Sequence, residues 1–532
     1  MTAIDLGTPE GTRTVDIVDE SVHSEAPAFA GRTEWVGLLV LALACLVYAM
    51  DLTVLHLAVP MISADLHPTS SQLLWIIDVY GFMVAGLLIT MGTLGDRIGR
   101  RRMLMIGAAS FAVVSVVAAF APTAEALIVC RALLGIAGAT LAPSTLSLIF
   151  NMFRDPRQRS VAVGVWVGAF SAGGAVGPIF GGVLLENFWW GSVFLLAVPV
   201  MVLLLALGPK VLPEFRDPEA GRLDPISAAL CVGTMIAVVF GMKKIAQDGV
   251  GAAALAGLIG GAALGVLFAR RQLTRADPML DLRLFRLSRF RVALLINIVG
   301  IFVAFGYFLF VAQYFQLVLA MSPLAAGLAM APSGIGFIVG SQLAPRLVQL
   351  VRPAYLIGGG LAVAGVGLLM MTQLSASGGY GLALSASVIS ALGLAPVFGI
   401  TTELVVGAAP PEQAGAASGV SETGAEFGGA LGISILGSIS IAIYRGDLSS
   451  SLPAGLSEAD SGSVRDTLGA AVHVSTQVPT ALGESVLAAA REAFLHGVHI
   501  TAGIAGVAAL AIAVVSVRKL REIPAGPLTH EE

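Results

Sequence analysis

Fourteen separate apolar segments dominate this sequence, each close to or above the length needed to cross a lipid bilayer. A hydrocarbon core requires roughly 20 apolar residues per spanning helix. Because no water is available inside the bilayer, such a segment must bond its backbone groups internally, as a helix does. The predicted spans are 36–60, 72–94, 103–121, 124–150, 160–184, 190–208, 225–242, 251–269, 291–319, 324–345, 354–373, 379–406, 414–444 and 496–517. The chain is therefore predicted to be an all-α polytopic membrane protein.

The composition agrees with this class and excludes several others. Of the 532 residues, 56% are hydrophobic and 12% are charged, whereas soluble domains carry about 25% charged residues. The net charge of −4 and the lack of a basic patch with interleaved aromatics give no indication of nucleic-acid binding. The three cysteines lie in apolar runs without paired spacing, so we interpret Cys45, Cys130 and Cys231 as small core residues rather than disulfide or metal partners.

The distribution of basic residues predicts the orientation in the membrane. Cytoplasmic loops of membrane proteins are enriched in Lys and Arg. With the N-terminus placed inside, most of the 30 Lys and Arg residues fall in inner segments, and Arg131 lies within the fourth span. The outer segments then contain only Lys243, Lys244, Arg445, Arg465 and Arg491. Both termini are therefore predicted to be cytoplasmic, and the excess of Arg over Lys favours a bacterial cytoplasmic membrane.

A short cytoplasmic loop between the second and third spans combines turn glycines, one acid and several arginines. Such a loop can act as a two-state gate if the acid accepts charge-assisted hydrogen bonds in one conformation and loses them in the other. The alternative is that the arginines serve only as topology determinants. The candidate gate residues are Gly92, Asp96, Arg97, Gly99, Arg100 and Arg101.

This loop resembles the signature loop of the major facilitator superfamily, and other motifs fall where that family has them. They resemble those of the fourteen-helix drug:proton antiporters, which include quaternary-ammonium and multidrug exporters. The matching segments are Asp51–Pro60, Trp75–Tyr80, Arg131–Gly135, Gly164–Gly182 and Ser421–Gly429. The glycine-rich segment Gly164–Gly182 resembles the antiporter motif of the family. The resemblance implies that this bent helix seals the substrate path during exchange, and a role in helix packing alone is the alternative. Its residues are Gly173, Gly174, Gly177, Pro178, Gly181 and Gly182.

The resemblance implies two six-helix bundles built from inverted repeats, with two additional helices between them. The predicted organisation is a disordered cytosolic tail at 1–34, an N-terminal bundle at 35–208, a linker at 209–224, two transmembrane helices at 225–269, a linker at 270–290, a C-terminal bundle at 291–517 and a tail at 518–532. The long outer loop 445–495 is predicted to be either a helical hairpin or a solvated linker.

Charged residues inside apolar spans indicate function, because each costs about 2.5–3.5 kcal/mol on insertion scales. Asp51, Asp78 and Arg131 are expected at a similar depth in three different spans. A buried carboxylate stays charged beside an arginine and takes up a proton when it is desolvated alone. We therefore predict that Asp51 couples transport to protons, that Arg131 modulates it, and that Asp78 titrates or attracts cations. Static ion pairing is the alternative.

Two further acids and several aromatics are candidates for substrate binding. Glu422 and Glu426 are four residues apart and lie on one helical face. A cationic compound in an apolar cavity requires an opposite charge, and aromatic rings can add cation–π contacts. The candidate aromatics are Trp166, Phe170, Tyr307 and Tyr314, for each of which plain packing is the alternative.

The sequence thus predicts an antiporter that exports lipophilic, cationic compounds in exchange for protons. No phosphate-binding loop of the type Gly-x-x-x-x-Gly-Lys-Ser/Thr occurs, and no nucleophile–base arrangement is recognisable, so neither an ATP-driven pump nor an enzyme is indicated. The expected partners are small-molecule substrates, protons and the lipid bilayer, with no cofactor, no metal, no nucleic acid and a monomeric state. The alternative function is export of one endogenous metabolite or self-made antibiotic.

Overall fold

The computed structural model describes residues 29–216, 224–275, 278–409 and 414–525, and in these ranges the chain forms helices and no strand. Fourteen of its helical segments are long and apolar enough to cross a membrane, which confirms the predicted number. The tail predicted at 1–34 lies outside the described residues as far as residue 28. The long helices of the first half are α1 (Arg32–Leu66), α2 (Ser70–Ile98), α3 (Arg100–Ala119), α4 (Ala124–Met152), α5 (Pro156–Asn187), and α6 with α7 (Ser192–Leu195, Ala197–Val211).

The remaining helices follow after the first linker. They are α8 (Pro225–Asp248), α9 (Ala252–Thr274), η1 (Leu284–Arg286), α10 (Ser288–Gln313) with the π-turn η2 (Tyr314–Val318), α11 (Pro323–Leu350), α12 (Pro353–Met370) with η3 (Met371–Gln373), α13 (Tyr380–Gly407), α14 (Ala414–Ser451), α15 (Glu458–Asp466), α16 (Leu468–Ser475) and α17 (Thr480–Leu520).

Several of these helices begin with a local signal that is visible in the sequence. Asp155, Asp224 and Ser322 each precede a proline, and each accepts a hydrogen bond from the backbone N–H three residues later. A side-chain oxygen at this position satisfies an N–H that the helix leaves free, and proline fits the first helical position because its missing N–H is not needed there. These caps determine where the helices α5, α8 and α11 begin.

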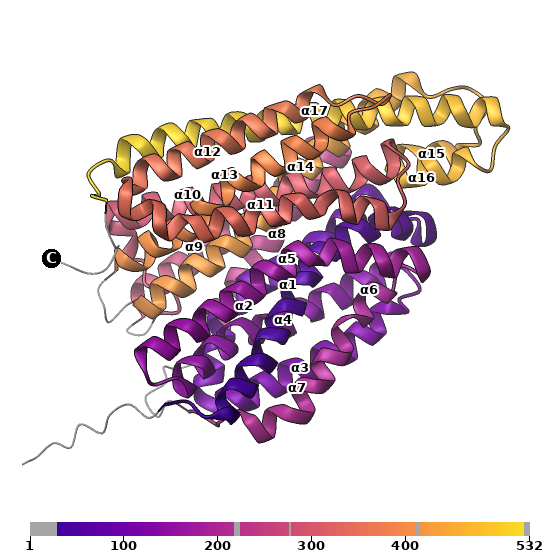
Figure 1. Ribbon diagram of the computed structural model, residues 1–532. Helices are drawn as coiled ribbons and strands as arrows, with labels where there is room; N and C mark the ends of the chain where they lie inside the picture. The colour runs from indigo at the N-terminus through magenta and orange to yellow at the C-terminus, as the bar shows by residue number, and fades with distance from the viewer. Residues whose placement is uncertain (1–28, 217–223, 276–277, 410–413, 526–532) are drawn as a thin grey trace, which may run out of the picture.

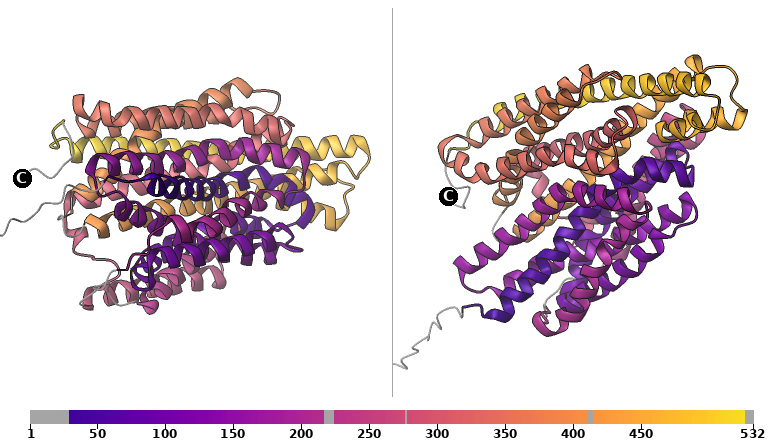
Figure 2. Two further views of the ribbon diagram at one scale, coloured as in Figure 1. Left: turned by 60° about the horizontal axis from the view of Figure 1, so that its bottom comes forward. Right: turned by 45° about the vertical axis from the view of Figure 1, so that its right-hand side comes forward.

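The helices form two halves that diverge toward one end of the molecule. Figure 1 shows α1–α7 in the lower half and α10–α17 in the upper half, and the right-hand view of Figure 2 shows the same separation. The halves meet most extensively where α5 packs against α11 and where α2 packs against α14. The start of α1 and the end of α17 lie at the end where the halves separate.

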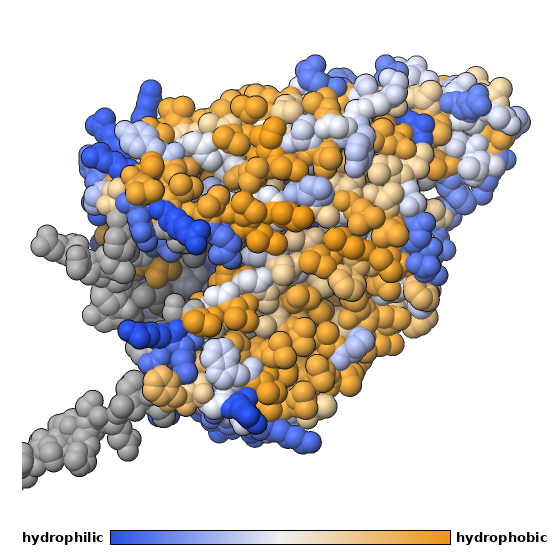
Figure 3. Space-filling model, in the orientation of Figure 1, coloured by the Kyte–Doolittle hydropathy of each residue, from blue (hydrophilic) through white to orange (hydrophobic). Residues whose placement is uncertain are grey.

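The outer surface of the molecule has the polarity of a membrane protein. In Figure 3 apolar side chains cover most of the visible face, whereas hydrophilic side chains gather at its two ends. The same view shows the surface hollowed between the halves at its left-hand end, where α1 begins and α17 ends in Figure 1. The apolar band therefore faces lipid, and the hollow opens between two polar-ended halves.

At the opposite end, α14 and α17 extend beyond the other helices, and α15 and α16 lie between them (Figures 1 and 2). The helix α16 packs against α1 of the other half, and Ser70 at the start of α2 donates a 2.6 Å hydrogen bond to the carbonyl oxygen of Asp466. The segment 445–495, for which the sequence left a hairpin or a linker open, is thus helical over much of its length and contacts both halves.

The two additional helices α8 and α9 form a hairpin that packs on α2 and α14. At the linker end of this hairpin, Asp224 is buried and accepts hydrogen bonds from Arg271 at 2.9–3.3 Å, while Arg275 lies 3.3 Å from the same carboxylate. The Arg271 guanidinium holds the pKa of Asp224 below its ordinary value. This ion-pair cluster joins the first turn of α8 to the last turns of α9.

We expect Asp224→Ala to loosen this end of the hairpin, since loss of a helix N-cap alone costs about 0.5–2 kcal/mol. Hydrogen exchange of residues 225–235, followed by mass spectrometry, should become severalfold faster. Because the folded pKa lies below the unfolded value, the carboxylate stabilises the fold above that unfolded value of about 4. The difference in exchange rate between wild type and variant should therefore stay constant from neutral pH to about pH 5 and shrink on further acidification. Equal exchange at neutral pH would contradict the assignment.

Candidate functional site

The first element of the site is an ion pair between α1 and α4. Arg131 Nη1 lies 2.7 Å from Asp51 Oδ2, and the two side chains are 1% and 9% exposed. Arg131 also donates through Nε to the carbonyl oxygen of Ile76 at 3.1 Å, and its guanidinium lies 4.6 Å from the ring centroid of Tyr80. The structure thus brings together two of the three residues predicted for proton coupling. The contacts with Asp51 and with the carbonyl oxygen of Ile76 hold the Arg131 guanidinium in place.

The third predicted coupling residue, Asp78 on α2, has a different partner. Lys243 Nζ lies 3.0 and 2.9 Å from the two carboxylate oxygens of Asp78, and Ser434 on α14 donates a short hydrogen bond to Oδ2. The prediction that Lys243 lies in an outer segment is wrong. The helix α8 continues to Asp248, and Lys243 is only 2% exposed. A buried carboxylate opposite α8 supplies the charge that makes this burial possible.

The predicted acids of α14 face the first half. The hydroxyl group of Tyr48, on α1, donates a 3.0 Å hydrogen bond to Glu426 Oε1. Glu422 lies one helical turn away and is half-buried. Tyr48 stands three residues before Asp51 on the same helix, so the contact links the acid of α14 with the helix that carries the acid–arginine pair. Sequence reasoning missed Tyr48, although its spacing from Asp51 was the available signal.

The predicted aromatics of α5 continue from this contact. The Phe170 ring lies 4.7 Å from that of Trp166 and 5.6 Å from that of Tyr48, both in edge-to-face geometry. Trp166 donates a 3.0 Å hydrogen bond to Thr145 on α4. These rings therefore form one aromatic cluster between α1, α4 and α5.

Two neighbouring cavities lie between the halves. One, of about 540 Å³, is lined by Asp78, Arg131 and Glu426 among apolar residues. The other, of about 740 Å³, is almost entirely apolar and is lined by Phe170, Tyr307 and four further aromatic rings, Phe305, Phe308, Phe337 and Phe398. Phe305 lines both. An apolar space beside convergent charged groups is the usual form of a small-molecule site.

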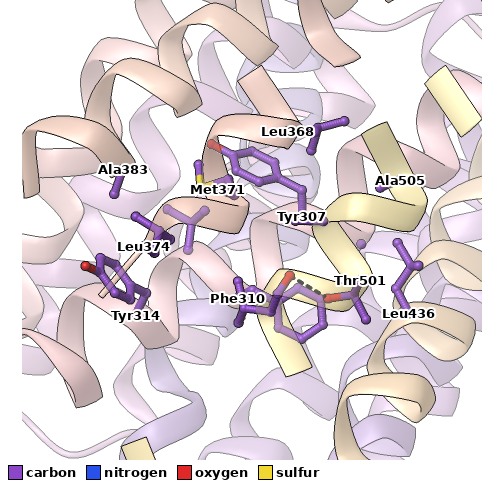
Figure 4. A pocket seen from close by; sticks show the side chains of 14 residues that line it. Tyr307, Phe310, Tyr314, Leu368, Met371, Leu374, Ala383, Leu436, Thr501 and Ala505 are labelled. Atoms are coloured by element: carbon purple, nitrogen blue, oxygen red, sulfur yellow. Dashed lines mark hydrogen bonds between the residues drawn. The ribbon is translucent and has the colours of Figure 1, made fainter. Parts of the chain in front are cut away.

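Tyr314 lies apart from these cavities. Its hydroxyl group donates to the carbonyl oxygens of Ser375 and Gly378 at 3.0 and 2.9 Å. Figure 4 shows it at one side of a third cavity, of about 390 Å³, inside the second half. Tyr307 lines this cavity as well as the 740 Å³ one. The structure therefore places Tyr307, but not Tyr314, in the aromatic cavity that adjoins the one lined by the acids.

The candidate gate loop is bound to its own half. Asp96 and Arg100 form an ion pair at 2.5 Å, and Arg100 Nη1 donates to the carbonyl oxygen of Pro143 in α4. Arg101 donates to the carbonyl oxygen of Leu212 at 3.0 Å. Gly99 has φ +111°, a conformation that side chains rarely adopt. Of the remaining predicted residues, Arg97 is exposed, and a Cβ atom at Gly92 would lie 3.7 Å from Pro143.

The glycine-rich motif of α5 serves two interfaces. Gly173, Gly177 and Gly181 are each four residues apart and face α1, where an added Cβ atom would overlap Leu46, Thr53 or Val54. Gly182 faces the other half, since an added Cβ would lie 2.8 Å from the carbonyl oxygen of Pro323 in α11.

Two residues of the motif differ from these. The carbonyl oxygen of Pro178 lies against Gly327 of α11, so this residue also belongs to the contact between the halves. Gly174 has nothing within 4 Å of such a Cβ and lines the 740 Å³ cavity. Small residues thus allow close approach at two helix crossings.

The described residues contain no group of three or more His, Cys, Asp or Glu side chains placed to hold a metal ion. Two acids of the site are paired with cations on other helices, Asp51 with Arg131 and Asp78 with Lys243. The arrangement offers Asp78, Glu426, the buried cation Arg131 and an aromatic cavity to a molecule that enters between the halves.

Comparison with known proteins identifies the family. The sequence profile of the Major Facilitator Superfamily matches residues 41–433. The chain is 43% identical to the multidrug efflux pump LfrA of Mycolicibacterium smegmatis, over 90% of this chain and 95% of that protein. It is 34% identical to the methyl viologen resistance protein SmvA of Salmonella typhimurium, over 90% and 97%. A solved bacterial homologue of the human lysosomal transporter Spinster, in an inward-facing and unoccupied conformation, has a TM-score of 0.66 at 18% identity and covers 94% of this chain and 100% of its own. The protein is therefore a multi-pass membrane transporter of the major facilitator superfamily and not an enzyme.

Proposed function

We propose that this transporter exports lipophilic cations, such as quaternary ammonium compounds and dyes, in exchange for protons across a bacterial cytoplasmic membrane. The observation that carries the proposal is the pair of adjoining cavities, one lined by Asp78 and Glu426 and the other by aromatic rings. A lipophilic cation needs both an opposite charge and an apolar surface. The names of the relatives, a multidrug pump and a resistance protein against the dication methyl viologen, support the same class.

The Asp51–Arg131 pair is the proposed site of proton coupling. While Asp51 is charged, it holds Arg131 at 2.7 Å. A proton on Asp51 would cancel this attraction and free the guanidinium, so protonation would change the contacts that α1 and α4 make with each other. A pH step supplies about 1.36 kcal/mol per unit and the membrane potential about 2.3 kcal/mol per charge per 100 mV. These driving forces require neither nucleotide nor cofactor.

Both termini are proposed to be cytoplasmic, on the strength of the basic residues in the segments that flank the spans. The surface is hollowed between the halves at the end where α1 begins and α17 ends, so this conformation would open to the cytoplasm (Figure 3). Substrate would enter there, and the packing of α5 on α11 would close the opposite side. Alternating access then requires that contact to break as the other end closes.

We expect Glu426→Gln and Glu422→Gln to reduce efflux of ethidium, a cationic dye, by roughly tenfold, because a half-buried carboxylate that meets a cation is worth about 1–2 kcal/mol. The measurement is fluorescence efflux from energised cells with equal membrane levels of each variant. Glu484→Gln, which removes the same charge from an exposed position on the outer part of α17, is the matched control.

Three outcomes of the same assay are informative. Collapse of wild-type efflux on addition of a protonophore supports proton coupling. Efflux that persists with the protonophore contradicts it. If the wild type exports no cationic dye while remaining in the membrane, the multidrug proposal fails, and a dedicated exporter of one metabolite becomes the better assignment.

A further inference from the structure

One buried cation of the site comes from outside the two six-helix halves. Lys243 belongs to α8, and its ammonium group is bonded to both oxygens of Asp78 on α2. Ser434 on α14 donates to the same carboxylate. Three helices, one from each half and one from the additional hairpin, therefore meet at a single acid.

The carboxylate of Asp78 borders two environments. It lines the 540 Å³ cavity, whose described lining includes Arg131 and Glu426 but not Lys243. The ammonium group lies outside that lining, with Nζ 3.9 Å from the ring centroid of Trp75. A molecule in the cavity can thus reach the acid without meeting the lysine first.

A charged lysine and a positive substrate cannot both be neutralised by this one carboxylate. Removing an ammonium group from its acid inside a membrane protein is costly unless another partner is available. The face of Trp75 is such a partner, because an aromatic ring attracts a cation within about 6 Å of its centroid. The neighbouring packing of Phe82, Met235 and Val239 against Ala430 keeps water away from this side.

We propose that Lys243 is a built-in counter-ion that a cationic substrate displaces from Asp78. By competing for the acid, the lysine sets how strongly the cavity holds positive charge. Displacement also removes a link between α8 and α2 at the point where α14 of the other half is bound. The additional hairpin is thereby part of the selectivity of the transporter, and this inference rests on the proposed export of cations.

The wild-type protein provides a direct test through lysine reactivity. The sequence has four lysines, Lys210, Lys243, Lys244 and Lys519. Purified transporter in lipid nanodiscs would be treated with formaldehyde and a borane reductant, and dimethylation at each lysine would be followed by peptide mass spectrometry. We expect Lys243 to react slowly alone and roughly tenfold faster with tetraphenylphosphonium, since a paired, buried amine is shielded. The exposed Lys210 should not change, and neutral triphenylphosphine oxide should have no effect at Lys243.

Variants test the competition itself. Lys243→Met should bind tetraphenylphosphonium roughly tenfold more tightly, which corresponds to about 1.4 kcal/mol. Lys244→Met, the same change one residue along the helix, should bind like the wild type. The gain should vanish when Asp78→Asn is present as well, because the lysine then has no acid to occupy. Asp78→Asn alone should make Lys243 reactive without any added cation.

Three results would overturn the inference. The first is a Lys243 reactivity that tetraphenylphosphonium leaves unchanged or lowers although the cation binds. The second is an affinity of Lys243→Met equal to that of Lys244→Met, and the third is a gain in affinity that persists in the Asp78→Asn background. If Lys243→Met does not fold, the wild-type labelling still decides. If the wild type binds no cation at all, the proposed function fails first, and the two failures are thus distinguishable.

Discussion

Replacement of Arg131 with methionine is expected to abolish transport and to lower the free energy of unfolding by about 3–5 kcal/mol, the cost of leaving a buried charge without its partner. Asp51 would lose its 2.7 Å contact, and the carbonyl oxygen of Ile76 would lose its donor. Dye efflux from proteoliposomes with an imposed pH gradient measures the first effect. Thermal unfolding in detergent, followed by tryptophan fluorescence, measures the second.

The double variant Arg131→Met with Asp51→Asn separates stability from coupling. It removes both charges, so much of the lost stability should return, because replacing a buried pair with neutral groups is often close to neutral. Efflux should remain absent, since no titrating acid is left on α1. Full pH-driven efflux by either variant would show that the pair does not couple transport to protons.

The second large effect is expected at Gly173, the first of two adjacent glycines of α5. An added Cβ at Gly173 would overlap the carbonyl oxygen of Leu46 and lie 2.8 Å from Ala49 Cβ, so Gly173→Ala must push α1 and α5 apart. Overpacking of this kind costs about 1–3 kcal/mol. Because α1 carries Tyr48 and Asp51, we expect a tenfold or greater loss of efflux together with a lower unfolding temperature.

Gly174→Ala is the matched control. A Cβ atom there meets nothing within 4 Å. Alanine in a helix interior is more stabilising than glycine by about 0.5–1 kcal/mol. Its unfolding temperature should therefore equal or exceed that of the wild type. If both substitutions had the same effect on stability, the assignment of Gly173 to the α1 crossing would be wrong.

The sequence carried enough information for the number of membrane spans and for the acids within them. Hydrophobic length is a local property, and Asp51, Asp78, Glu422 and Glu426 stand out because charges are expensive in apolar segments. The caps of Asp155, Asp224 and Ser322 are equally local.

Pairing between distant helices could not be read in the same way. The segment that ends at Lys243 looks like a span followed by outer basic residues, because a lysine is costly in lipid until an acid faces it. Only the packing of α8 against α2 shows that Asp78 is that acid. Likewise, Tyr307 and Tyr314 are close in sequence, yet the π-turn at the end of α10 directs Tyr314 to carbonyl groups of its own half.

The sequence by itself determined that this protein crosses a membrane fourteen times, that it belongs among transporters built from paired bundles, and which titratable groups lie in apolar surroundings. The spans and their titratable groups follow from hydrophobicity and residue type along each segment, whereas the paired bundles were implied by motifs that resemble those of the family. The tertiary structure decided which charges neutralise each other, which glycine faces a helix and which a cavity, and which aromatics share a space with the acids. Such features depend on the rotation and depth of helices hundreds of residues apart, which no local pattern specifies.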